Sequence, residues 1–72
     1  MSLEEDFYSR YRVVDVKLRK VKYGENPWTI CSAEGDIPVW LLQKFNRHIK
    51  IEKIRVNTTI HIPVVKERAS KN

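Results

Sequence analysis

Hydrophobic and polar residues alternate along a stretch in the first third of the chain. Apolar residues occupy the even positions from Val14 to Leu18, with charged residues between them. This period of two, rich in β-branched residues, predicts a half-buried strand over residues 12–22. The apolar positions then shift to an odd number at Val21, and we therefore expect a bulge or break near residues 19–20.

A second alternating stretch lies near the carboxyl end, where residues 58–62 predict another strand. Asn57 comes just before it and is a turn residue, because asparagine tolerates positive φ. Pro63 either ends this strand or marks an edge position, since proline cannot donate a ladder hydrogen bond. Residues 46–57 show no clean period, and we interpret them as a long connection.

A short helix is predicted after the first strand. Gly24 breaks the strand, and Asn26 can cap the free amides of the next turn. Pro27 suits the first helical position, where its missing N–H costs nothing. The helix should run from Pro27 to about Glu34, with Gly35 in the left-handed conformation just past its end.

A second helix is predicted from Pro38 to residue 45 or 46 for the same reason. Val39, Leu42 and Phe45 recur at three-residue spacing and should form its buried face. Trp40 lies off that face. We expect an aromatic-containing arm at the amino terminus to cover it; the alternative is a contact with another domain or subunit.

The predicted order is strand, helix, helix, strand, which indicates an α+β fold. Two strands alone are barely stable in water, so the two short helices should pack on one face of a two-stranded antiparallel sheet. We divide the chain into a flexible amino-terminal arm at residues 1–11, a domain at residues 12–65, and a disordered charged tail at residues 66–72.

Composition narrows the classes of function. The 72 residues suffice for one small domain, and the net charge of +5 favours acidic partners. One cysteine allows no internal disulfide, and with two histidines it offers no zinc-binding spacing. No phosphate loop, nucleophile elbow or acid pair is present, so we expect no catalysis, metal or cofactor. No run of about 20 apolar residues could span a membrane, and the acidic start is not a signal peptide.

The order of these segments resembles the lysin motif (LysM) family. In that family a strand ending in Val leads to Gly-Asp/Glu-x-x-Trp-x-Ile-Ala, then to Leu-x-x-x-Asn, then to a strand ending in Ile-Pro. The matching residues here are Val21, Gly24, Glu25, Trp28, Ile30, Leu42, Asn46, Ile60, Ile62 and Pro63. The chain departs from the pattern at Cys31, at Glu34 where an aromatic is common, at the additional Asp36, and at Asn57 in place of a turn glycine.

The resemblance implies a βααβ domain that binds N-acetylglucosamine-containing glycans, peptidoglycan or chitin, without chemistry. Such domains use loop backbone and apolar side chains between the first strand–helix loop and the loop after the second helix. The matching positions are Gly24, Glu25, Asn26 and Pro27 in the first loop, and Asn46, Arg47, His48, Ile49, Lys50 and Ile51 in the second. The resemblance also implies a bacterial envelope or extracellular location, anchoring a larger protein whose other domains would be further partners.

Each of these residues also has a plainer interpretation. Gly24, Asn26 and Pro27 would suit a helix start alone, and the basic residues of the second loop could be a solvated surface. Trp28 is expected to pack the first helix against the sheet, and Cys31 to be a small core residue. The alternative function is a LysM-like interaction or packing domain that binds no glycan. Nucleic-acid binding is suggested by charge alone, without a recognition motif, and is not expected.

Overall fold

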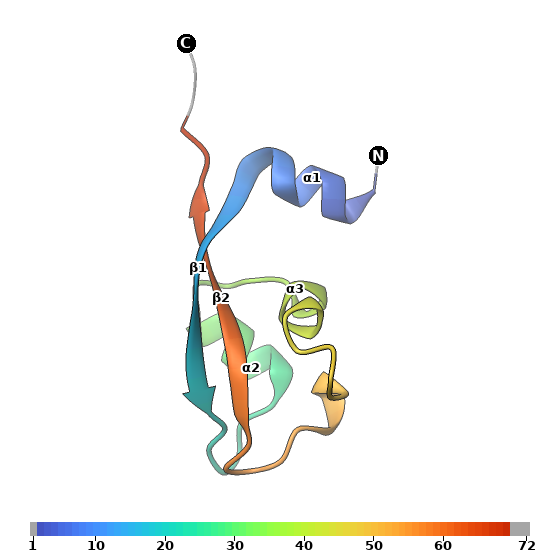
Figure 1. Ribbon diagram of the computed structural model, residues 1–72, viewed down its shortest axis with the longest axis vertical. Coiled ribbons are helices and arrows are strands. Elements are labelled where there is room, and N and C mark those ends of the chain that lie inside the picture. The colour runs from blue at the N-terminus through green and yellow to red at the C-terminus, as the bar shows by residue number, and fades with distance from the viewer. Residues whose placement is uncertain (1, 70–72) are drawn as a thin grey trace.

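The computed structural model describes residues 2–69 of the chain, which form an elongated molecule of 45 × 21 × 18 Å (Figure 1). A two-stranded sheet forms its long axis, and short helices lie along one side. In chain order the elements are α1 (Leu3–Arg10), β1 (Tyr11–Lys20), α2 (Pro27–Ala33), α3 (Val39–Lys44), the 3-10 helix η1 (Ile51–Lys53) and β2 (Thr59–Glu67). The predicted α+β class with a two-stranded antiparallel sheet is confirmed.

The sheet is an antiparallel ribbon in which Tyr11 lies opposite Glu67 at one end and Lys20 lies opposite Thr59 at the other. The pairing shifts between Val13 and Asp15, so the bulge predicted near residues 19–20 is wrong. Arg19 and Val21 lie on the inner face of the ribbon, where Val21 is buried. The even-numbered Val14, Val16 and Leu18 lie on the outer face and are exposed. The alternating apolar residues Val14, Val16 and Leu18 therefore do not form the buried face of this strand.

The starts and ends of α2 and α3 follow the predicted signals closely. The Asn26 side chain accepts a hydrogen bond from the Thr29 N–H at 2.9 Å and caps α2, with Pro27 at the first helical position. Gly35 follows α2 with φ of 88°, the left-handed conformation expected there. Pro38 is the N-cap of α3 rather than its first residue.

Residues 3–10 form helix α1, whereas the sequence was interpreted as a flexible arm over residues 1–11. The Ser2 hydroxyl accepts a bond from the Glu5 N–H, and the Glu5 carboxylate accepts one from the Ser2 N–H. This reciprocal capping box satisfies two amides that a helix start leaves free. The sequence Ser2-Leu3-Glu4-Glu5 carries this signal, and its acidic first turn complements the helix dipole.

The expected contact between the amino-terminal segment and Trp40 is confirmed. The Phe7 and Tyr8 rings meet the Trp40 ring edge-on, with centroids 5.4 and 6.1 Å away. Lys44 on α3 also forms an ion pair with Glu4 on α1. Helix α1 is therefore packed over α3, and Trp40 is partly buried beneath it.

Strand β2 continues to Glu67, so residues 66–67 are not part of a disordered tail as predicted. Pro63 lies within β2 and pairs with Val16. It therefore does not end the strand, and the prediction that it marks an edge position is the one that agrees with the structure. Beyond the strand, the Arg68 N–H donates to the Arg10 carbonyl oxygen at 2.7 Å. Residues 70–72 of the predicted tail lie outside the described residues.

The core lies between α2, α3, η1 and one face of the ribbon. Its fully buried aliphatic side chains come from four elements and from the residue that follows β1; they are Val21, Ile30, Leu41, Leu42, Ile51, Ile60 and Ile62. Ile60 and Ile62 alternate with the exposed His61, which confirms the predicted period of β2. Within residues 2–69, no helix is long and apolar enough to cross a membrane.

Candidate functional site

Two connections meet at the end of the ribbon that is farthest from α1 (Figure 1). The first links β1 to α2, and the second links α3 to β2. Val21 joins them, because its N–H donates to the Thr58 carbonyl oxygen at 2.9 Å and its own carbonyl accepts from the Asn57 N–H at 2.7 Å. Asn57 has φ of 71°, the positive value predicted for this turn.

The first connection is a tight turn around Gly24. The Glu25 N–H donates to the Lys22 carbonyl oxygen at 3.1 Å, and the Glu25 carboxylate accepts from the Lys22 N–H at 2.8 Å. Gly24 has φ of 84°, and a Cβ placed on it would meet nothing within 4 Å. Glycine is thus required here by backbone conformation, and the space above its backbone is open to a ligand.

The Glu25 carboxylate is held by the protein itself. It bonds the Lys22 N–H and forms an ion pair with Arg19. The bond from the Lys22 amide, and secondarily the Arg19 guanidinium, lowers the pKa of Glu25 below its ordinary value. This side chain is therefore an ionised support of the turn.

Asn26 and Pro27 serve the start of α2. The Asn26 carboxamide oxygen bonds the Thr29 N–H, and the Thr29 hydroxyl accepts from the Asn26 N–H at 3.0 Å. Pro27 is buried. The Asn26 carbonyl oxygen also accepts from the Ile30 N–H at 3.0 Å. Both residues are thus committed to the start of α2 and to the core, which agrees with their plainer interpretation as a helix start.

Two aromatic side chains beside this turn are exposed. Tyr23 is 93% exposed and Trp28 is 64% exposed. The predicted packing of Trp28 against the sheet is wrong, because α2 buries Ile30 and Cys31 instead and turns Trp28 outward. Exposed apolar surface that is contiguous often marks an interaction site, and these two rings lie on either side of one short turn. Neither residue was among the predicted site positions, although both flank the Gly24–Pro27 segment.

Asn46 forms the buried anchor of the second connection. Its Nδ2 donates to the Leu42 carbonyl at 2.7 Å and to the His61 carbonyl at 2.8 Å, and its Oδ1 accepts from the His61 N–H at 2.8 Å. The residue is fully buried. Asn46 therefore fastens the end of α3 to β2, and its side chain has no group left to offer a ligand.

Gln43 shapes the rest of this connection. Its Nε2 donates to the carbonyl oxygens of Asn46 and Ile49, and its Oε1 accepts from the Ile51 N–H at 2.9 Å. Ile51 is buried in the core. No sequence pattern predicts this role of Gln43, because it depends on how the connection folds back over the helix.

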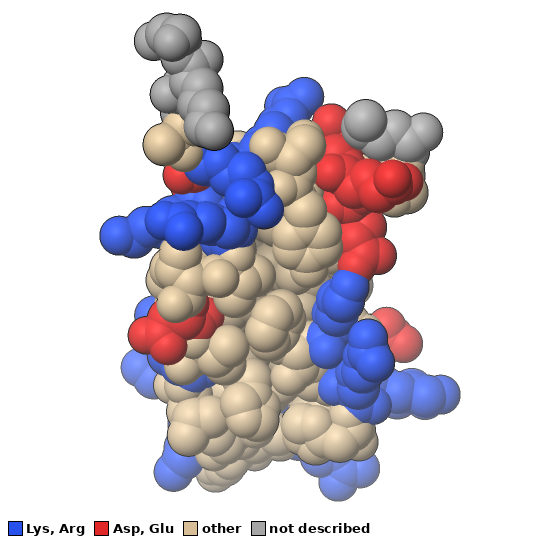
Figure 2. Space-filling view, turned by 45° about the horizontal axis from the view of Figure 1, so that its top comes forward, with Lys and Arg blue, Asp and Glu red and all other residues tan. Residues whose placement is uncertain are grey.

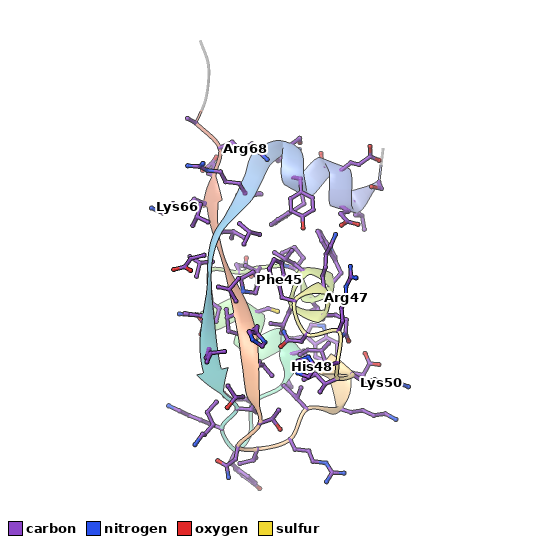
Figure 3. All side chains as sticks on the ribbon, in the orientation of Figure 1. Phe45, Arg47, His48, Lys50, Lys66 and Arg68 are labelled. Atoms are coloured by element: carbon purple, nitrogen blue, oxygen red, sulfur yellow. The ribbon has the colours of Figure 1, made fainter. Side chains whose placement is uncertain are left out.

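The remaining predicted residues of the second connection lie at the surface (Figure 3). Arg47, His48 and Lys50 are exposed, and Ile49 is partly buried. The His48 ring lies edge-on to that of His61, with centroids 6.1 Å apart. A shallow hollow of about 290 Å³ occurs here; its lining residues are Ile49, Lys50, Lys53, Ile54, Arg55 and Thr58.

The structure thus brings together part of the predicted site. The hollow includes Ile49 and Lys50 but none of the residues Gly24–Pro27. The first turn adjoins the hollow through Thr58, which lines it and bonds to Val21. The two connections therefore form one continuous surface at this end of the ribbon, with an open backbone turn beside an apolar and basic hollow.

Ionisable groups elsewhere do not form a reactive constellation in the described part of the chain. Glu34 pairs with Lys17 at 2.7 Å and with Arg19 at 2.5 Å, which ties α2 to β1. Burial, and secondarily the charge of Asp36, raises the pKa of Cys31 to about 11, so its thiol stays protonated near neutral pH. No group of three His, Cys, Asp or Glu within residues 2–69 is placed to hold a metal ion.

Comparisons with protein-family models, with curated proteins and with solved structures each find no match to this chain.

Proposed function

We propose that this protein is a non-catalytic LysM-like module that binds N-acetylglucosamine-containing glycan, most naturally peptidoglycan, and anchors a larger envelope protein to it. The observation that carries the proposal is the open Gly24 turn flanked by the exposed rings of Tyr23 and Trp28, beside the hollow at Ile49. The ordered LysM-like residues and the βααβ arrangement support it.

The chemistry of this surface suits an acetylated sugar. An aromatic ring offers a flat apolar face with a polar edge, which complements the apolar face of a pyranose. The acetamido group carries one N–H and one C=O, and irregular backbone around Gly24 can pair with both. The partly buried Ile49 offers apolar contact to the acetyl methyl group.

The basic residues around the hollow add a preference among glycans. Lys50, Lys53 and Arg55 line it, and no salt bridge holds them among the described residues. Positive charge near a binding surface speeds the encounter with an anionic partner. Peptidoglycan carries carboxylates and chitin does not, so this charge favours peptidoglycan.

The test is an NMR titration of the ¹⁵N-labelled chain with N-acetylglucosamine oligomers, with maltose oligomers as a control lacking the acetamido group. The expected result is saturable shifts at Gly24, Glu25, Trp28 and Ile49 with the acetylated oligomers only. Trp28→Ala should weaken binding, whereas Val14→Ala, an exposed apolar change on β1, should not. The absence of shifts at millimolar oligomer, or equal shifts with maltose oligomers, would refute the proposal.

A second candidate function rests on a different surface. Val14, Val16 and Leu18 on β1 are each at least 40% exposed, and β1 has one edge without a partner strand among the described residues. An unpaired edge with apolar neighbours can add a strand from another protein. Concentration-dependent association in sedimentation, lost on Leu18→Lys, would support this interaction role; a monomer at every concentration, with no partner strand bound, counts against it.

A further inference from the structure

Basic residues gather at the opposite end of the ribbon, beside α1 (Figure 2). Arg12 lies directly opposite Lys66 across the two strands. The Arg68 N–H donates to the Arg10 carbonyl oxygen at 2.7 Å, which extends the pairing one step further. Side chains directly opposite each other in an antiparallel pair have Cβ atoms about 5 Å apart, so this end concentrates positive charge.

Arg12 and Lys66 point to solvent. Their neighbours Val13 and Val65 are partly buried and pack against the core. Successive side chains of a strand point to opposite faces, which turns the two basic residues outward, and both are exposed. Their charges are thus available on one outer face of the ribbon, where Figure 3 labels Lys66.

Carboxylates do little to neutralise this group. Arg10 has Asp6 at 3.7 Å, but within residues 2–69 no salt bridge reaches Arg12, Lys66 or Arg68. The Asp15 carboxylate accepts a bond from the Val16 N–H at 2.8 Å. Like charges placed directly opposite on a sheet destabilise it, so the folded protein retains an unfavourable pair here that an anion would relieve.

Arg68 is already positioned for such a contact. Its Nε donates to the Tyr8 carbonyl oxygen at 2.6 Å at the end of α1, and its main chain is held by Arg10. The two terminal nitrogens of its guanidinium remain for a ligand. An open hollow of about 490 Å³ adjoins it, lined by Ser9, Arg12, Arg68 and Ala69.

We propose that this end of the ribbon binds a phosphate group, as a monoester or diester, between Arg12, Lys66 and Arg68. Two guanidinium groups provide paired N–H donors that match phosphate oxygens, and a lysine adds a point charge. The first turn of α1 carries Glu4, Glu5 and Asp6 at the end of the helix away from the ribbon (Figure 1), and these carboxylates would repel a long polyanion that extends along α1. The expected ligand is therefore one phosphate on a compact molecule or at the end of a larger one.

The test is an NMR titration of the full chain with glycerol phosphate and with inorganic phosphate, with chloride keeping the ionic strength constant. Saturable shifts are expected for Arg12, Lys66 and Arg68, including the arginine Nε–H signals. The R12Q/K66Q variant should bind about tenfold more weakly or worse, because it loses charge-assisted hydrogen bonds. The K53Q/R55Q variant removes the same charge at the other end and should bind like the wild type.

Thermal melting gives a second readout that does not depend on assigning spectra. R12Q/K66Q should melt above the wild type without phosphate, because the opposed charges are gone. Phosphate at low millimolar concentration should raise the melting temperature of the wild type and not that of the variant. A lower melting temperature for the variant would show that the pair stabilises the fold and would contradict the premise.

Binding of the same variants to single-stranded DNA and to phosphatidylglycerol vesicles tests whether a larger polyanion is the ligand instead. If either binds, and both double variants weaken it equally, the interaction follows net charge and the phosphate site is overturned. If the two double variants lose glycerol phosphate binding equally, the interaction again follows net charge and the phosphate site is overturned. Failure of the glycan titration would leave this result intact, since the two surfaces lie at opposite ends of the ribbon.

Discussion

Replacing Asn46 tests how the second connection is held in place. Asn46→Ala removes a side chain that makes three hydrogen bonds, two as donor to the Leu42 and His61 carbonyls and one as acceptor from the His61 N–H. Water cannot easily replace them, because the residue is fully buried. Leaving a buried polar group without a partner costs about 1–3 kcal/mol, and we expect a total loss of about 3 kcal/mol.

This loss is large for a chain of this size. Domains have about 0.05–0.15 kcal/mol of stability per residue, which for 72 residues corresponds to roughly 4–11 kcal/mol. With a urea dependence of about 1 kcal/mol per M, the unfolding midpoint should fall by about 3 M. Urea titration followed by circular dichroism measures this shift directly.

Two further variants separate hydrogen bonding from packing. Asn46→Asp keeps the shape but points an oxygen at two carbonyl groups, so at pH 7 it should lose at least as much stability as the alanine variant. Arg47→Ala changes the exposed neighbour and should alter stability by less than about 0.5 kcal/mol. A loss below about 1 kcal/mol for both Asn46 variants would refute the bonding described for this residue.

Three other outcomes are expected. Trp40→Ala should cost about 2 kcal/mol and speed amide exchange throughout α1, because the helix loses the ring on which it packs. Glu34→Gln should flatten the acid limb of the stability curve: Lys17, then Arg19, lowers the pKa of Glu34, so this stabilisation is present above the ordinary carboxylate pKa and lost as pH falls through the lowered one. The pKa of Cys31 is raised from 9.0 to about 11, so the stability of the folded protein should be constant below pH 9 and fall as pH rises toward 11. At pH 8 the buried thiol should react with a disulfide reagent only as fast as the protein unfolds.

Each of these has a contrary result. Unchanged exchange in α1 after loss of Trp40 would mean that the helix is held by other contacts. An acid limb that is the same in wild type and Glu34→Gln would mean that the ion pairs of Glu34 contribute nothing. Rapid thiol reaction at pH 8 in the folded protein would mean that Cys31 is accessible.

Features fixed by neighbouring residues could be predicted from the sequence. The cap at Asn26, the positive φ of Gly35 and Asn57, and the period of β2 are each determined within a few residues, and all are confirmed. Asn46 was predicted as a site residue from its place in the sequence pattern. Its burial and its bonds to β2, however, join groups that are distant in the chain, and no local pattern reports them.

Features that depend on packing were predicted less well. Trp28 and Leu41 lie on short helices where several faces are partly apolar, and only the arrangement of the elements decides that Leu41 is buried and Trp28 is exposed. The bulge between Val13 and Asp15 depends on the partner strand. Helix α1 is different, because its capping box from Ser2 to Glu5 is a local signal that the sequence itself carries.

The ladder between Arg10 and Arg68 places the beginning and the end of the described chain at the same pole of the molecule. A tag, a surface linker or a fused protein attached at either terminus would therefore sit beside α1, leaving the Gly24 turn and the Ile49 hollow facing away from the attachment. Copies immobilised through a terminus would all present the Gly24 turn and the Ile49 hollow to an insoluble polymer. The same attachment would crowd Arg12 and Lys66, so phosphate is best measured with the protein free in solution.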